Sequence, residues 1–377
     1  MALLSIPVAL SIAFSVGDQI IDEYFPNRSG NHVSYSCEKE LDLRRPGMAM
    51  ESMPFLEQGD TNLCAPYTAS ELIDAWRTVR AKRSLAPRER TSPMALGVEF
   101  AAKNDFPYSF PLQNSTDPMA REAGRWGGIV CVYVNSAREI GSCSDDALKE
   151  FQGKSPEAIA KTDALFHALK DYLALSPRDR EEKRPRFAER ILTILASLPP
   201  PLEKGDLPTL EQITEELTFF TGDDPYVPMS RLLLAGCRKH RTPLPELPKC
   251  RTKIDSGLDG FGWGFRHVPF REAETFKKLK ELLARENPTP VAITYCHRVV
   301  RKGFDYRPTS LLSPECHSHW SLVIGSRQRS GRCQFLIRDT DGGKTDRISP
   351  DWETDRGDVW LDAETLMSST YVLEWLE

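Results

Sequence analysis

The hydrophobic pattern changes from a helical period to strands along this chain, and this change limits the possible folds more than any other feature. Residues 64–83 have apolar side chains at spacings of three and four, which predicts an amphipathic helix. Further along, runs rich in Val, Ile, Leu and aromatic residues predict strands over residues 290–296, 319–324 and 333–338. A helical part followed by a β-rich part predicts an α+β fold.

The length of 377 residues predicts about two or three domains. We expect a helical lobe over residues 18–150, which carries the helix at 64–83, and a β-rich lobe over residues 286–377. Between them, residues 151–285 predict a helical insertion, whose helical patterns are interrupted by the charged run 177–186 and by a proline-rich stretch.

The last two predicted strands are joined by polar residues with two glycines, which indicates an antiparallel hairpin. A turn centred near Arg329 sets His319 directly beside Asp339. The hairpin therefore predicts that an imidazole and a carboxylate lie together on the sheet.

The start of the chain and its cysteines indicate export. The apolar run at residues 2–16 is shorter than the roughly 20 residues of a membrane-spanning helix, so residues 1–17 are predicted to be a signal peptide of a secreted or periplasmic protein. A buried first strand or helix is the alternative. In an exported chain, eight of the nine cysteines can form disulfides and one thiol stays free; in a cytosolic chain, most are small buried hydrophobes.

Composition excludes several classes of function. The chain is 40% hydrophobic and 27% charged, typical of a globular protein, and its net charge is −5. It has no excess of positive charge to neutralise a phosphate backbone, so we expect no nucleic acid partner. We also expect no integral membrane span.

One group of residues is suited to nucleophilic catalysis. Cys64 stands at the start of the predicted helix, where the helix dipole and free N–H groups favour a thiolate. His319 can share the thiol proton and Asp339 can orient the ring. Gln58 can donate a hydrogen bond to an oxyanion, together with the backbone N–H of Cys64.

These residues resemble the papain-like cysteine peptidases. The segment from Gln58 to Cys64 is similar to the Gln-Gly-x-x-x-x-Cys motif of that family, and Gly127-Gly128 is similar to its glycine pair, which contacts substrate backbone. His319 and the strand ending at Asp339 resemble the strands that carry the catalytic His and Asn. The resemblance implies a two-lobed fold, with the helical and β-rich lobes on either side of a cleft.

The chain also departs from that family. Asp339 replaces the usual Asn, Asp341 replaces the usual Trp, and Asp341 is an alternative third member of the triad. His317 competes with His319 for the role of base. The pair Cys296-His297 and the run from Cys316 to His319 would also suit zinc. Disulfides and ordinary histidines explain the same residues, so we expect no metal and no cofactor.

The predicted function is that of a cysteine peptidase, a thiol hydrolase that cleaves peptide bonds in a protein or peptide substrate. Two alternatives remain open. A transglutaminase-like amide transferase also uses a Cys-His-Asp set, and a catalytically inactive papain-fold protein would serve as a binding module. The sequence indicates neither the cleavage preference nor the oligomeric state.

Overall fold

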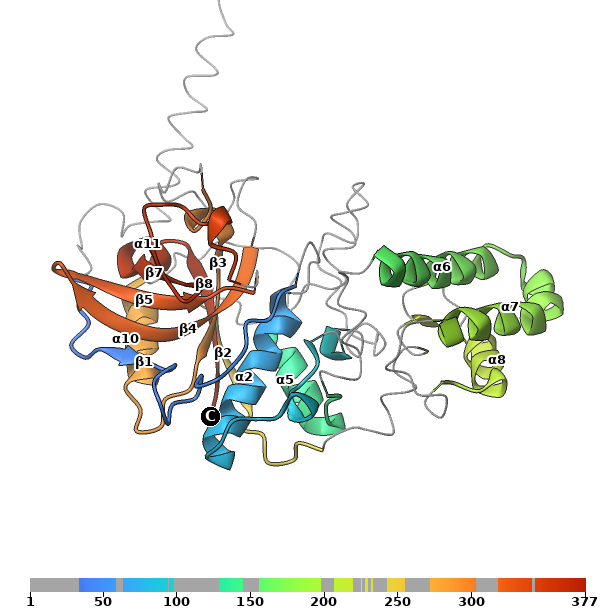
Figure 1. Cartoon of the computed structure of the whole chain (residues 1–377), viewed down its shortest axis with the longest axis horizontal. Helices are drawn as coiled ribbons and strands as arrows, with labels where there is room; N and C mark the ends of the chain where they lie inside the picture. Colours follow the sequence, from blue (N-terminus) through green and yellow to red (C-terminus); the bar gives the residue numbers. More distant parts are fainter. Residues whose placement is uncertain are drawn as a thin grey trace, which may run out of the picture.

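The fold is seen in a computed structural model (Figure 1). The predicted signal peptide, the pair Gly127-Gly128 and the alternative residues His317 and Asp341 lie outside the residues that it describes. The described residues are 34–58, 64–93, 95–97, 129–144, 156–197, 207–219, 225, 228–229, 232, 243–254, 272–302, 318–340 and 343–377.

The eight strands in the described residues form one antiparallel sheet. The strand order is β2-β8-β3-β4-β5-β7-β6, and the short β1 pairs with β4. The strands are β1 (Leu41–Asp42), β2 (Cys250–Ile254), β3 (Val291–Cys296), β4 (Ser318–Arg329), β5 (Arg332–Arg338), β6 (Glu353–Asp355), β7 (Asp358–Asp362) and β8 (Thr370–Leu376).

Helices cover both faces of this sheet (Figure 1). On one face, α2 (Cys64–Ala81) and α5 (Val130–Ile140) share a core with alternate residues of β4 such as Leu322. On the other face, α10 (Glu272–Leu283) and α11 (Ala363–Met367) share a second core with the intervening residues, such as Val323. The period of two in the strands divides their side chains between the two cores, and the predicted α+β class is confirmed.

Three helices form a separate core of their own: α6 (Pro156–Leu173), α7 (Pro177–Ser197) and α8 (Leu210–Phe219). The sequence prediction of an interruption at 177–186 is wrong, because α7 begins at Pro177 and continues through Pro185. Ser176 Oγ accepts a hydrogen bond from the Asp179 N–H at 3.2 Å, and a proline in the first turn loses no helical bond. The charged run is therefore the solvated side of a helix.

The β4–β5 hairpin turns later than the sequence predicts. Arg329 pairs with Arg332, and the two turn residues Ser330 and Gly331 have φ of 51° and 79°. Two left-handed residues in succession suit the right-handed twist of a hairpin. Continuing the pairing of Leu322 with Arg338 sets Asp339 opposite Ser321, so His319 is a diagonal neighbour of Asp339 rather than a direct partner.

Two disulfides fix the outer elements to the sheet. Cys37–Cys333 connects the segment before β1 to β5, and Cys131–Cys250 connects α5 to β2. Seven of the nine cysteines lie in the described residues; six of these are disulfide-bonded and Cys64 is a free thiol. Each helix in the described residues is too short or too polar to cross a membrane.

Three 3-10 turns complete the described elements: η1 (Pro87–Glu89), η6 (His297–Val299) and η7 (Thr345–Arg347). The first of them begins with a proline. The turn η6 follows β3 directly and places His297 beside the start of β4.

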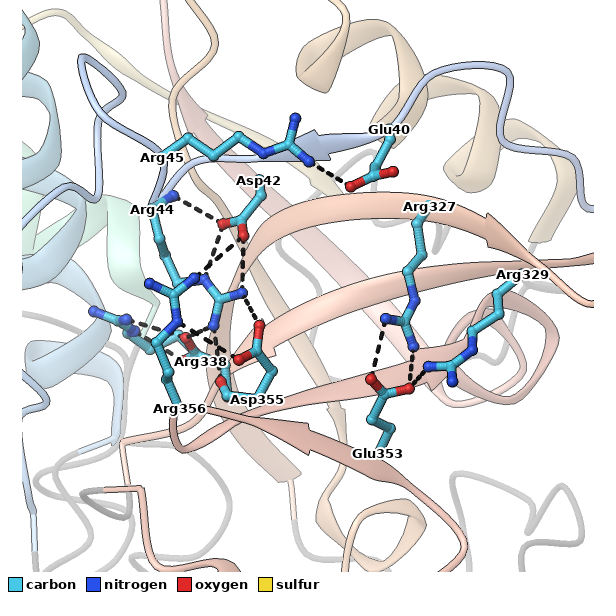
Figure 2. A network of polar contacts seen from close by, with 11 residues as sticks. Glu40, Asp42, Arg44, Arg45, Arg327, Arg329, Arg338, Glu353, Asp355 and Arg356 are labelled. Atoms are coloured by element: carbon cyan, nitrogen blue, oxygen red, sulfur yellow. Dashed lines mark hydrogen bonds and ion pairs between the residues drawn. The ribbon is translucent and has the colours of Figure 1, made fainter.

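A network of ion pairs connects the segment around β1 to β5, β6 and β7 (Figure 2). Arg44 donates to Asp42 at 2.9 Å and to Asp358 at 3.1 Å, and it also pairs with Asp355. Arg338 donates through Nε to the other oxygen of Asp358 at 2.9 Å. Asp358 is 0% exposed, so two guanidinium groups balance a buried carboxylate.

Candidate active site

Cys64 is the first residue of α2 and is half-buried. Its amphipathic helix packs against β4, which brings the start of the helix to the start of that strand. Cys64 lies close enough to His319 to raise the pKa of that imidazole, and Tyr133 of α5 lies close to the same thiol. The structure therefore brings the predicted nucleophile and the predicted base together.

His319 lies in β4 and Asp339 follows the last residue of β5, and both are buried. The distance from His319 Nε2 to Asp339 Oδ1 is 2.7 Å. Diagonal neighbours on one face of an antiparallel pair are within reach of long side chains, which explains this contact in spite of the shifted register. Because Nε2 is bound to Asp339, the ring leaves Nδ1 for the thiol.

The charges at this site favour a protonated His319. Burial alone would lower the pKa of His319, but Asp339 and Cys64 together raise that pKa to about 10. Burial alone would also raise the pKa of Asp339, but the two neighbouring histidines hold that pKa well below its usual range. At neutral pH the pair is therefore an imidazolium and a carboxylate.

A second histidine, His297, belongs to the same cluster. Its Nε2 lies 3.0 Å from Asp339 Oδ2, and its ring is stacked on the His319 ring with centroids 3.8 Å apart and planes 5° apart. In the sequence, His297 stands out only as a zinc ligand candidate, beside Cys296. The pairing of Tyr295 with His319 across β3 and β4 was the missing information, since it places the end of β3 beside the base.

The geometry of this cluster favours a shared carboxylate over a metal ion. Ligand atoms of His297, His319 and Asp339 all lie within 4.8 Å of one another. An imidazole nitrogen binds a metal through a lone pair in the plane of its ring. Two parallel rings 3.8 Å apart cannot both direct such a lone pair at one ion, whereas Asp339 offers each ring its own oxygen.

Gln58 is connected to the same group through Thr340. The Gln58 backbone N–H donates to the Thr340 carbonyl at 2.9 Å, and the Thr340 hydroxyl donates to Gln58 Oε1 at 2.7 Å. Because the amide oxygen is engaged, the amide NH₂ is the part of the Gln58 side chain that can donate to a substrate. Thr340 also lies 3.5 Å from His319 Nε2, and the sequence analysis did not identify it.

An aromatic side chain closes the inner side of the cluster. The buried Tyr295 ring meets the His319 and His297 rings edge to face, at centroid distances of 6.1 and 6.3 Å. Its hydroxyl is 3.2 Å from Ser321 Oγ. The imidazoles are thus shielded from water on this side, which strengthens their interaction with Asp339.

Comparison with known proteins gives distant structural similarity. No protein-family model matches the chain and no curated protein matches it. The solved structures similar to it include digestive procathepsin L 3 and the digestive procathepsin L2 proteinase, both from the larval midgut of Tenebrio molitor.

These similarities are too distant to assign an activity. The match to procathepsin L 3 has a TM-score of 0.41 and 11% identity, and it covers 95% of this chain and 78% of that one. The match to procathepsin L2 has a TM-score of 0.39 and 14% identity, and it covers 93% and 70%. A functional assignment therefore has to rest on the contacts of the site itself.

Proposed function

We propose that this protein is a cysteine peptidase in which Cys64 is the nucleophile, His319 the general acid and base, and Asp339 the residue that orients the ring. The observation that carries the proposal is that Asp339 Oδ1 lies 2.7 Å from His319 Nε2 and that Cys64 lies close enough to raise the pKa of the same imidazole. Cys64 is the only free thiol in the described part of the chain, and its place beside His319 supports a chemical role for it.

The first half of the reaction forms an acyl-enzyme. The Cys64 thiolate, paired with the already protonated His319, attacks the carbonyl carbon of a peptide bond, so that a C–S bond forms and the carbonyl oxygen becomes an oxyanion. The Gln58 amide and the Cys64 backbone N–H stabilise this charge. His319 then gives its proton to the leaving amine and the C–N bond breaks.

The second half releases the acyl group. A water molecule gives a proton to His319 and attacks the thioester carbon, the C–S bond breaks, and the thiolate is left beside the protonated His319, as at the start of the cycle. Asp339 keeps its negative charge throughout and stabilises the imidazolium at both stages. A carboxylate is suited to this role, because the high pKa of His319 depends on it.

Substrate binding, domain organisation and location belong to the same proposal. We expect Gly127 and Gly128 to contact the backbone of a protein or peptide substrate, and residues 151–285 to form an insertion between the lobes. From the same stretch, β2 and α10 pack with the sheet. The disulfides fit an exported protein, and residues 1–17 are proposed as its signal peptide.

The test is selective alkylation combined with a peptide assay. Iodoacetamide at pH 6 should modify Cys64 much faster than a small free thiol, and the modification should abolish cleavage of an unfolded protein substrate. Cys64→Ala should lose cleavage completely while its circular dichroism and melting temperature stay unchanged. A Cys64 that reacts no faster than the small thiol, in a protein that cleaves nothing, would falsify the peptidase assignment and favour a binding module.

One observation favours a second candidate, an amide transferase. The third member of the site is a carboxylate in contact with the histidine, the set that transglutaminases use. In that reaction the thiolate attacks a glutamine side-chain amide, ammonia leaves as the thioester forms, and an amine then attacks the thioester carbon and displaces the thiolate. Release of ammonia from a glutamine peptide with an added amine, without peptide cleavage, would select the transferase.

A further inference from the structure

His297 and His319 share a single carboxylate, and each ring takes one of its oxygens. His319 Nε2 lies 2.7 Å from Asp339 Oδ1 and His297 Nε2 lies 3.0 Å from Oδ2. An ionised carboxylate only accepts hydrogen bonds, so both nitrogens carry a proton. With both oxygens held, the Asp339 carboxylate has one orientation.

The two histidines differ in what faces their second nitrogen. His297 Nδ1 lies 3.5 Å from Arg301 Nη2, and a guanidinium only donates, so His297 Nδ1 is an acceptor without a proton. His319 faces the Cys64 thiol instead, a group that can give up a proton. The surroundings therefore favour a neutral His297 and a charged His319.

The stacking of His297 on His319 also favours one neutral and one charged ring. The rings are parallel and 3.8 Å apart, and two imidazolium ions at that separation would repel each other strongly. The side chain of His297 is only 13% exposed, so water screens the repulsion little. A neutral His297 ring covers one face of His319 without repelling it, so the positive charge of His319 interacts with Asp339 and Cys64.

We propose that His297 is a positioning residue of the catalytic site, which holds Asp339 in one orientation and covers one face of His319, and that Arg301 keeps it neutral. This inference rests on the proposed function, because it assigns His297 a role in the same Cys64–His319 pair. His297 itself touches neither the thiol nor the substrate in this role.

The charged groups around His297 agree with a neutral ring. Burial and the positive charge of His319 lower the pKa of His297 to about 4, against the opposing effect of Asp339, and Arg301 lowers it further. The neighbouring Tyr295 ring is uncharged. Protonation at acid pH would place a second positive charge on the face of His319 and draw Asp339 away from it.

The first experiment reads the protonation of each ring directly. Imidazole ¹⁵N shifts of the full chain at pH 6.5 should identify His297 as neutral, with the proton on Nε2, and His319 as an imidazolium. Cys64→Ala should leave the His297 signals unchanged, which assigns them independently of activity. A charged His297 beside a neutral His319 would overturn the inference.

The second experiment separates positioning from packing. His297→Phe keeps a flat ring against His319 but removes the donor to Asp339, and we expect kcat to fall about 10- to 100-fold with KM little changed, since small misplacements of a catalytic group have effects of this size. His167→Phe, on the exposed side of α6, is the matched control and should keep full activity. Equal kcat for both variants would refute the role of His297.

Arg301→Leu tests the protonation argument. Without the guanidinium, His297 should take up a proton at higher pH, so the acid limit of kcat should move up by about one pH unit. The same change in a His297→Phe background should leave that limit in place, because no second ring can be protonated. A shift of equal size in both backgrounds would contradict the proposal.

The outcomes distinguish this inference from the proposed function. If the protein cleaves no peptide but the ring states are as expected and His297→Phe slows alkylation of Cys64, the peptidase assignment fails and the positioning role stands. If the protein cleaves peptides and the His297 and His167 variants behave alike, the peptidase assignment stands and the positioning role fails.

Discussion

Two buried polar clusters on the same sheet balance their charges by different means. In the network around Arg44 and Arg338, guanidinium groups meet carboxylates (Figure 2), and guanidinium keeps its charge at every pH the protein meets. At the candidate site, Asp339 meets two imidazoles, which unlike a guanidinium can gain or lose a proton. Both clusters bury a carboxylate that two cationic or potentially cationic groups share.

A buried carboxylate shared by two nitrogen groups is structural in one cluster and suited to chemistry in the other. The arginines of the first cluster come from the segment around β1 and from β5, and they connect these to Asp358 of β7. Their charges are constant, so the cluster can only hold elements together. The imidazoles of the second can accept and release a proton, and only one of them faces a thiol.

The largest effect is expected when the permanent cluster is broken. Asp358→Asn leaves Arg44 and Arg338 without their shared buried anion, and removing one partner of a buried ion pair typically costs about 3–5 kcal/mol. The free energy of unfolding in urea should fall by that amount. The pH limits of activity should stay in place, because Asp358 is not part of the site.

Glu353→Gln is the control for that change. Glu353 pairs with Arg327 and Arg329 at the exposed edge of the same network, and surface pairs contribute at most about 1 kcal/mol. If Asp358→Asn and Glu353→Gln destabilise the protein equally, the buried network is not the structural connection that we describe.

The next effect is expected at the titratable cluster. Asp339→Asn removes the negative charge beside His319, and loss of an opposite charge at this distance lowers a pKa by about 1–3 units. The proton on His319 is lost as pH rises through about 10 in the native protein, so the alkaline limit of kcat should move toward neutral pH in the variant. An unchanged limit would show that Asp339 does not set the charge of His319.

Glu71 of α2 gives a third prediction, for stability. Burial raises the pKa of Glu71 to about 8, despite the nearby Arg338. A raised pKa means that the contribution to stability is fully present below about pH 4.5 and is lost as pH rises through 8. The amide side chain of Glu71→Gln never ionises, so the variant should have the native melting temperature at pH 5 and a higher one at pH 9. The corresponding gain in the free energy of unfolding at pH 9 should be about 1–3 kcal/mol.

Glu364→Gln, at an exposed position of α11, is the control for Glu71. Its melting temperature should follow the native protein at both pH values. If the melting temperatures of the native protein and of Glu71→Gln change with pH in the same way, Glu71 is ionised in the folded state. Its charge would then be balanced by Arg338 of the ion-pair network.

The smallest effect concerns the connection between Gln58 and the site. Thr340→Val removes the hydroxyl that donates to Gln58 Oε1, and a single neutral hydrogen bond is worth about 1 kcal/mol. We expect kcat to fall about fivefold, because the Gln58 amide is less well oriented, with no change in the alkaline limit. A moved alkaline limit would instead place Thr340 with the residues that set the charge of His319.

Much of the fold can be predicted from local patterns. The helix predicted at 64–83 is α2, and the strand predicted at 290–296 is β3. Both have a clear hydrophobic period, and burial against one core follows from that period. The charges at the start of α7 are compatible with either a solvated face or a loop, whereas Ser176 and Pro177 are a capping signal that favours a helix.

The site divides in the same way. Cys64, His319 and Asp339 can be selected from the sequence because each has a local signal: a helix start, a strand start and a strand end. His297 and Thr340 have none. Their roles come from the pairing of β3 with β4 and from the segment that carries Gln58, and sequence patterns do not specify which strands become neighbours.

The position of Cys64 at the junction of helix and sheet has a consequence for maturation. Its partner histidine lies far along the chain in β4, so the two residues meet only when α2 packs against the sheet. Until then the Cys64 thiol has no imidazole to take its proton, and it competes poorly in exchange with the disulfides Cys37–Cys333 and Cys131–Cys250. The Cys64 thiol therefore becomes reactive only after the disulfides have formed, when few thiols are left for it to exchange with.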